Sequence, residues 1–191
     1  MRMKNVLILH GAGNDHTGNW LPWLKDELEK KGYKVWSPDL PNSDVPNLRD
    51  WLETIFSNKD WNFDRESIII GHSAGATFIL RILEELPDNV KINKAVLVAG
   101  PANMGTIPDY FPYKREMVTP PFNWIKIKNS CEKFYFVHSD NDKYLCGEEN
   151  GKFFQKNLGG ELILKRDQGH FNLEVSPSYK KFPMLLEIIE K

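Results

Sequence analysis

The stretch SIIIGHSAGATFIL, residues 67–80, decides the fold of this 191-residue chain. A run of isoleucines ends at Gly71, and Ser73 stands at the centre of a Gly-x-Ser-x-Gly pentapeptide that Gly75 closes. From Ala74 onward the residues favour a helix. A buried strand, a tight corner and a helix form the context of a nucleophile elbow, in which small neighbours expose the serine oxygen. The pattern therefore predicts that Ser73 is a nucleophile.

Short apolar runs alternate with helical segments along the rest of the chain. Apolar runs predict strands at residues 5–9, 33–37, 67–70, 94–99, 133–138 and 161–165. Leucines at helical spacing, with glycine and proline as stop signals, predict helices at residues 21–31, 48–56, 74–86, 148–157 and 178–190. Continuously apolar strands that alternate with helices are typical of parallel sheets covered on both faces. We therefore expect a three-layer α/β/α sandwich with a mostly parallel sheet of about six strands.

Length and composition restrict the class of protein. A chain of 191 residues suits one domain, so we expect a single domain over residues 1–191. The formal net charge of −1 argues against a basic face that binds nucleic acid. Cys131 and Cys146 are too few for a disulfide scaffold, and reduced thiols are typical of cytoplasmic proteins. The sequence has neither a signal-peptide pattern nor a membrane-spanning stretch. We expect a cytoplasmic protein that acts on a small molecule.

Residues 101–130 interrupt the alternation of strands and helices. The segment combines prolines with aromatic residues: Pro101, Pro108, Pro112, Pro120, Pro121, Tyr110, Phe111, Tyr113, Phe122 and Trp124. Prolines this dense prevent a long regular helix at the start of the segment. Two interpretations stay open, a surface loop over one end of the sheet and an aromatic flap over a site. A flap would give a small apolar pocket.

A serine nucleophile needs a base, and the chain offers five histidines. His170, in the sequence GHFN after the last expected strand, should lie at the same sheet edge as Ser73 and is our candidate. We expect His10 and His138, at strand ends, to be structural. His72 should point away from Ser73, and His16, in a loop, stays open as a pocket residue.

An orienting acid and oxyanion donors complete the machinery. The acid should lie between the serine and the histidine in sequence. The loop SDNDKYL, residues 139–145, offers Asp140 and Asp142, and spacing alone does not separate them. For the oxyanion we expect the N–H of Ala74, at the helix start, and the N–H of Ala12 in the loop HGAGND, with Gly13 as the alternative.

The same loop admits a competing interpretation. Gly11-x-Gly13 could begin a dinucleotide-binding fingerprint, and Asp39 ends the second expected strand, where an acid would bind ribose. However, His16 occupies the position of the third glycine, and a long polar loop follows. A Rossmann-type nucleotide-binding oxidoreductase is therefore the second hypothesis. A non-catalytic binding module is a third, against which the set of serine, aspartate and histidine argues.

Taken together, these features resemble the alpha/beta-hydrolase superfamily. Within it they are similar to the small serine hydrolases grouped with retinoblastoma-binding protein 9 and the YdeN type of bacteria. The similar stretches span most of the chain: HGAGND, WLPWLKDELEKKG, PDLPN, SIIIGHSAGA, NWIKIKNSC, SDNDKYL and GHFN. The resemblance implies a compact core without a lid domain, Ser73 as nucleophile and His170 as base. It also implies that Asp142, the second aspartate of its loop, is the orienting acid.

One departure from that family limits what carries over. The family's human member has a Leu-x-Cys-x-Glu segment before the elbow strand, whereas this chain reads DWNFDRESIII there. Binding of the retinoblastoma protein is therefore not expected. We expect a serine hydrolase that cleaves a small carboxylic ester, thioester or amide through an acyl-enzyme on Ser73. This chemistry needs no metal and no organic cofactor.

Overall fold

A parallel sheet of six strands, in the order β2-β1-β3-β4-β5-β6, forms the centre of the molecule. This computed structural model describes residues 4–102, 121–144 and 146–191. The strands are β1 (Asn5–Leu9), β2 (Lys34–Trp36), β3 (Ser67–His72), β4 (Ile92–Val98), β5 (Cys131–Ser139) and β6 (Glu161–Lys165). The expected parallel sheet is confirmed.

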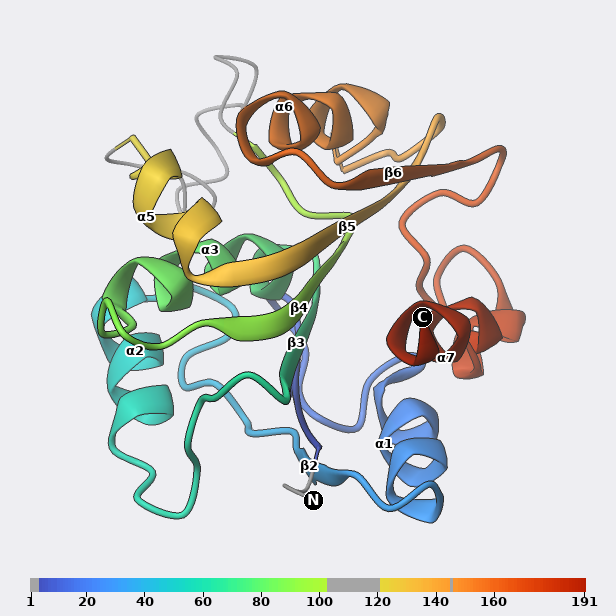
Figure 1. Cartoon of the computed structure of the whole chain (residues 1–191). Coiled ribbons are helices and arrows are strands. Elements are labelled where there is room, and N and C mark those ends of the chain that lie inside the picture. The colour runs from blue at the N-terminus through green and yellow to red at the C-terminus, as the bar shows by residue number, and fades with distance from the viewer. Residues whose placement is uncertain (1–3, 103–120, 145) are drawn as a thin grey trace.

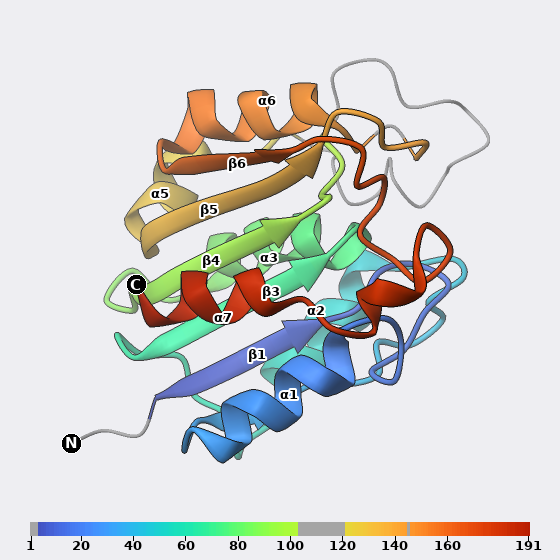
Figure 2. The same cartoon turned by 90° about the vertical axis from the view of Figure 1, so that its right-hand side faces the viewer.

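Helices cover both faces of the sheet (Figures 1 and 2). On one face lie α1 (Leu21–Lys30) and α7 (Pro183–Glu190), and on the other lie α2 (Leu48–Phe56), α3 (Ala74–Glu85), α5 (Trp124–Asn129) and α6 (Glu148–Leu158). Alternate residues of β1 point to opposite faces, so Val6 and Ile8 enter one core cluster while Leu7 and Leu9 enter the other. The three-layer sandwich is therefore confirmed. None of the described helices is long and apolar enough to cross a membrane.

The strand order places a crevice at the carboxyl ends of β1 and β3. The chain leaves β1 to form β2 on one side and returns to form β3 on the other, so the loops that follow β1 and β3 diverge. Leu9, the last residue of β1, pairs with Gly71, one residue before β3 ends at His72. Open α/β sheets bind ligands at such a switch point. The loop that begins at His10 and the corner at Ser73 thus lie side by side.

The last predicted helix is broken in the structure. Instead of one helix over residues 178–190, a 3-10 turn over Pro177–Lys180 precedes α7, which begins at Pro183. Proline suits the first turn of a helix but disfavours helical backbone in the preceding residue. Phe182 accordingly has a φ of −142°. The other helices and strands differ from the prediction mainly by a residue or two at their ends.

The proline-rich segment is described only at its two ends. Tyr110, Phe111 and Tyr113 lie outside the described residues. After Pro121 the chain forms a short helix, α5, that the sequence pattern did not predict. The side chain of Asn123 caps this helix by accepting a hydrogen bond from the Lys126 N–H at 3.0 Å.

Phe122 and Trp124 pack against the helices α3 and α6. Their ring centroids are 5.0 Å apart, and Trp124 meets Phe153 of α6 at 5.6 Å. The guanidinium of Arg81 in α3 lies 4.2 Å from the centre of the Phe122 ring. Neither aromatic residue lines the cavity at Ser73. These two residues therefore belong to the core rather than to a flap over the site.

Candidate active site

Ser73 occupies a strained corner between β3 and α3. Its backbone has φ 55° and ψ −124°, a conformation that non-glycine residues rarely adopt. The Ser73 N–H donates to the Val98 carbonyl at 2.9 Å. A Cβ at Gly71 would lie 2.4 Å from the Gly75 carbonyl oxygen, and one at Gly75 would lie 2.2 Å from the His10 oxygen. Both glycines of the pentapeptide are therefore required by close backbone packing.

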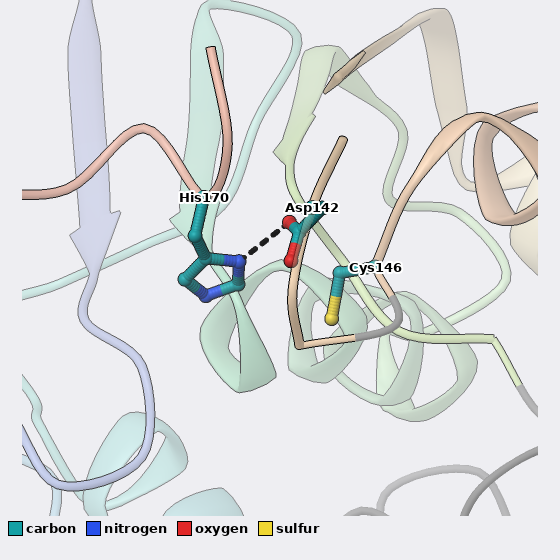
Figure 3. Close-up of side chains that lie close together, drawn as sticks. All are labelled: Asp142, Cys146 and His170. Carbon is teal, nitrogen blue, oxygen red and sulfur yellow. Dashed lines mark hydrogen bonds and ion pairs between the residues drawn. The ribbon is translucent and has the colours of Figure 1, made fainter. Parts of the chain in front are cut away.

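A buried hydrogen bond joins the predicted base to one of the two candidate acids (Figure 3). The Nδ1 of His170 donates to Oδ2 of Asp142 at 2.7 Å, and the two side chains are 6% and 0% exposed. The other carboxylate oxygen of Asp142 accepts from the Tyr144 N–H at 2.7 Å. Burial opposes ionisation of Asp142, but the hydrogen bond and charge of His170 outweigh it and lower the pKa of Asp142. Asp142 is thus an ionised partner for an imidazole.

Asp140 serves a different purpose. Its carboxylate accepts a hydrogen bond from the Asp167 N–H at 2.9 Å, and the side chain is exposed. Asn141, between the two aspartates, accepts from the Gly169 N–H at 2.7 Å. Both residues therefore tie the loop after β5 to the loop that carries His170. The bracing role of Asn141 was missed, although a polar run directly after a strand is a signal that could have suggested it.

Ser73 and His170 border the same cavity, which has a volume of about 250 Å³. Its described lining comprises Gly11, Ala12, Gly13, Asn14, Asn19, His72, Ser73, Tyr144, His170, Asn172 and Glu174. The backbone of Gly11 packs closely against Ser73, because a Cβ on Gly11 would lie only 2.8 Å from the Ser73 Cβ. Ala12 lines the cavity directly. Ala74 is the first residue of α3, so its N–H has no acceptor within the helix.

The described lining of this cavity is polar, whereas we expected an apolar wall. Three of its side chains are carboxamides, those of Asn14, Asn19 and Asn172. The ring centroids of Tyr144 and His170 are 4.7 Å apart, and the Tyr144 hydroxyl donates to Glu174. Asn14, Tyr144 and Asn172 lie within the motifs HGAGND, SDNDKYL and GHFN. The sequence predicted no place for them at the cavity, because their loops meet only in the folded chain.

The other histidines are mostly structural, as expected. His10 accepts from the Leu40 N–H at Nε2 and donates from Nδ1 to the Gly11 carbonyl, both at 2.8 Å. His138 is buried and contacts the Cys146 carbonyl through Nδ1 at 2.7 Å. His16 bonds to Asp39 at 2.7 Å and does not line the cavity.

His72 is the exception among the histidines. We expected it to point away from Ser73, but it borders the same cavity. Its Nε2 donates to the main-chain carbonyl of His170 at 2.8 Å. Burial, together with the charge of nearby His170, lowers the pKa of His72 to about 3. The loop that carries His170 folds back over the end of β3, where His72 lies.

The features of a dinucleotide site do not come together. Asp39 is bonded to the N–H of His16 at 3.0 Å as well as to its ring, which occupies the proposed ribose acceptor. The first helix begins only at Leu21, so no helix N-terminus follows Gly13 closely enough to hold a pyrophosphate. The geometry therefore disfavours the nucleotide-binding hypothesis.

Two groups of side chains within the described residues could each offer three ligand atoms to a metal. In each group the atoms lie within 4.8 Å of one another. Asp15, His16 and Asp39 form an exposed group, while Asp142, Cys146 and His170 form an inner one (Figure 3). In both groups a histidine Nδ1 is already bonded to an aspartate. The serine chemistry would use the Asp142–His170 pair of the inner group without a metal.

Known proteins with similar sequences and structures span most of the chain. A family model described as Serine hydrolase matches residues 6–191. YdeN of Bacillus subtilis (strain 168) is 35% identical over 180 residues, covering 90% of this chain and 92% of that protein. Serine hydrolase RBBP9 of Rattus norvegicus is 26% identical over 163 residues, covering 85% of this chain and 83% of that protein. The crystal structure of B. subtilis YdeN superposes with a TM-score of 0.88 and 25% identity, covering 98% of this chain and 97% of that one.

Proposed function

This chain belongs to the serine hydrolase family, and from this premise we propose that it cleaves a small carboxylic ester, thioester or amide through an acyl-enzyme on Ser73. The resemblance stated from the motifs is confirmed, and the protein is a hydrolytic enzyme. One observation carries the proposal. The buried His170–Asp142 hydrogen bond of 2.7 Å belongs to an imidazole that borders the same cavity as Ser73.

The proposed reaction has two halves. In the first, Ser73 Oγ attacks the substrate carbonyl while His170 Nε2 takes the hydroxyl proton, and the same proton then passes to the leaving group as its bond to carbon breaks. In the second, a water attacks the acyl-enzyme, His170 takes the water's proton, and that proton returns to Ser73 as the acid is released. Asp142 holds the imidazole with its proton on Nδ1 and stabilises the imidazolium.

Two main-chain N–H groups are proposed to bind the oxyanion that forms in each half. Ala74 offers the N–H of the first residue of α3, where the helix dipole favours negative charge. Ala12 offers the N–H of a loop that lines the cavity beside Ser73. Donors held in place before the reaction need no reorganisation as the charge develops.

The reaction scheme calls for no metal or organic cofactor, and we propose a single catalytic domain over residues 1–191. The ligand is a small molecule rather than nucleic acid, since the net charge is −1. Cys131 and Cys146 are buried and form no disulfide, which fits a reducing compartment, and we propose the cytoplasm.

A fluorophosphonate probe tests the proposed nucleophile. We expect the native protein to form one covalent adduct, located on the peptide that contains Ser73 by mass spectrometry, because only an activated serine attacks such probes. The exposed Ser178 does not line the cavity, so Ser178→Ala is a matched control that should label at the native rate. An adduct on another serine, or no adduct with the folded protein, would contradict the assignment.

The volume of the cavity predicts a preference for small acyl groups. In a series of p-nitrophenyl esters, each methylene that fits should stabilise the transition state by at most about 1–3 kcal/mol and raise kcat/KM accordingly. The rise should stop once the pocket is full. A cavity of about 250 Å³ with polar lining should favour short chains over long-chain lipids. A steady rise through long acyl chains, with activation at a lipid interface, would instead indicate a lipase.

A further inference from the structure

The loop that carries His170 depends on contacts from outside it. Gly169 and Phe171, the two neighbours of His170, have φ values of 54° and 51°. Glycine adopts such a φ readily. For Phe171 it is sparsely populated and persists only where the surroundings hold the backbone in place. The segment between β6 and the turn at Pro177 has neither helix nor strand to hold it in place.

Two ring N–H groups donate to consecutive carbonyls of this loop. His72 Nε2 donates to the His170 carbonyl at 2.8 Å, and Trp20 Nε1 donates to the Phe171 carbonyl at 3.1 Å. Both donors are buried, with His72 3% and Trp20 0% exposed. Their rings also touch, with centroids 5.8 Å apart at an angle of 74°. We call Trp20 and His72 the ring clamp.

The ring clamp connects the base to the nucleophile. His72 ends β3 and directly precedes Ser73, while Trp20 directly precedes α1. The His72 ring also lies 4.8 Å from the His170 ring. A hydrogen bond from His72 to the main chain of His170 therefore sets the position of the base relative to the neighbouring serine.

We propose that Trp20 and His72 are positioning residues that hold His170 in reach of Ser73 through the His170 and Phe171 carbonyls. The inference rests on the proposed function and adds two residues to it. Neither residue needs to exchange a proton or touch the acyl group. Positioning to within a fraction of an ångström controls the rate of such reactions.

The protonation state of His72 suits this role. Burial and the charge of His170 lower the pKa of His72 to about 3, so its ring is neutral at neutral pH. A neutral ring with the proton on Nε2 can donate to the His170 carbonyl. It also places no positive charge beside the imidazolium that His170 becomes during the reaction.

Variants at His72 separate donation from packing. His72→Phe keeps an aromatic ring but removes the donor, and His72→Gln keeps an N–H at about the reach of Nε2 without the ring. We expect His72→Phe to lower kcat about 10- to 100-fold with little change in KM, because the base is displaced while binding is not. His72→Gln should recover most of this loss. Native kcat in His72→Phe, or equal losses in both variants, would overturn the proposal.

Trp20→Phe is the second test and does not depend on His72→Phe being folded. It removes only the Nε1 donor and should lower kcat about tenfold, since a buried carbonyl is left without its partner. The matched control is Trp51→Phe, because Trp51 is equally buried and donates to the Pro41 carbonyl at 2.8 Å, away from the base. The control should lose comparable stability and keep native kcat. Equal kcat in the two variants would contradict the role of Trp20.

A spectroscopic measurement distinguishes failure of this inference from failure of the proposed function. In protein with ¹⁵N-labelled histidine, NMR reports which ring nitrogen of His170 and His72 carries the proton. We expect Nδ1–H for His170 and Nε2–H for His72, and a mixed or exchanging signal for His170 in His72→Phe and Trp20→Phe. This readout needs no substrate. An unchanged His170 signal in both variants would reject the clamp whether or not Ser73 is the nucleophile.

Discussion

Replacing Ser73 with alanine is expected to lower kcat for ester hydrolysis by about a million-fold, the loss typical when a serine nucleophile is removed. Without Oγ no acyl-enzyme forms, and only the weak assistance of the oxyanion donors to direct attack by water remains. The measurement is turnover of a short-chain p-nitrophenyl ester with purified native and variant protein. A variant that keeps a few per cent of native kcat would exclude Ser73 as the nucleophile.

The fold of this variant provides its own control. Alanine keeps the Cβ, so the strain at φ 55° is unchanged, and the hydrogen bond from the main-chain N–H of residue 73 to Val98 remains. The thermal midpoint of Ser73→Ala should therefore stay close to that of the native protein. A large fall in the midpoint would mean that the lost activity reflects unfolding instead.

Asp142→Asn should lower kcat by about 10⁴-fold, as expected when an orienting carboxylate becomes an amide. The amide can donate to Nδ1 of His170, which favours the tautomer whose Nε2 already carries a proton and cannot take one from Ser73. The side chain of Asp142 is fully buried and bonded to His170 at 2.7 Å. Steady-state kinetics of the purified variant measure the effect.

Asp140→Asn is the matched control for this prediction. It makes the same chemical change two positions away in the same loop, and an asparagine oxygen can still accept the Asp167 N–H that Asp140 binds. We expect its kcat to stay within a few-fold of native. If Asp140→Asn is the crippled variant and Asp142→Asn is nearly native, the orienting acid is not Asp142.

The sequence alone predicted most of the fold, because each strand and helix depends on residues close to one another in the chain. The isoleucine run before Gly71 and the alternation of apolar and helical segments were enough for a parallel sheet with helices on both faces. The glycines around Ser73 predicted a tight corner, and the structure shows backbone segments in van der Waals contact there. The break before α7 could also have been inferred from Pro183, whose effect on Phe182 is local.

The tertiary structure decided which groups meet at the cavity. Spacing could not separate Asp140 from Asp142, since both follow the same strand, whereas the fold directs one to the Asp167 N–H and the other to His170. The position of His72 beneath the His170 loop was likewise invisible in the sequence, because 97 residues of chain separate them. Contacts of this kind depend on where separate loops converge at one sheet edge. Local residue patterns determine secondary structure, but the direction of a side chain at a site is set by distant parts of the chain that pack around it.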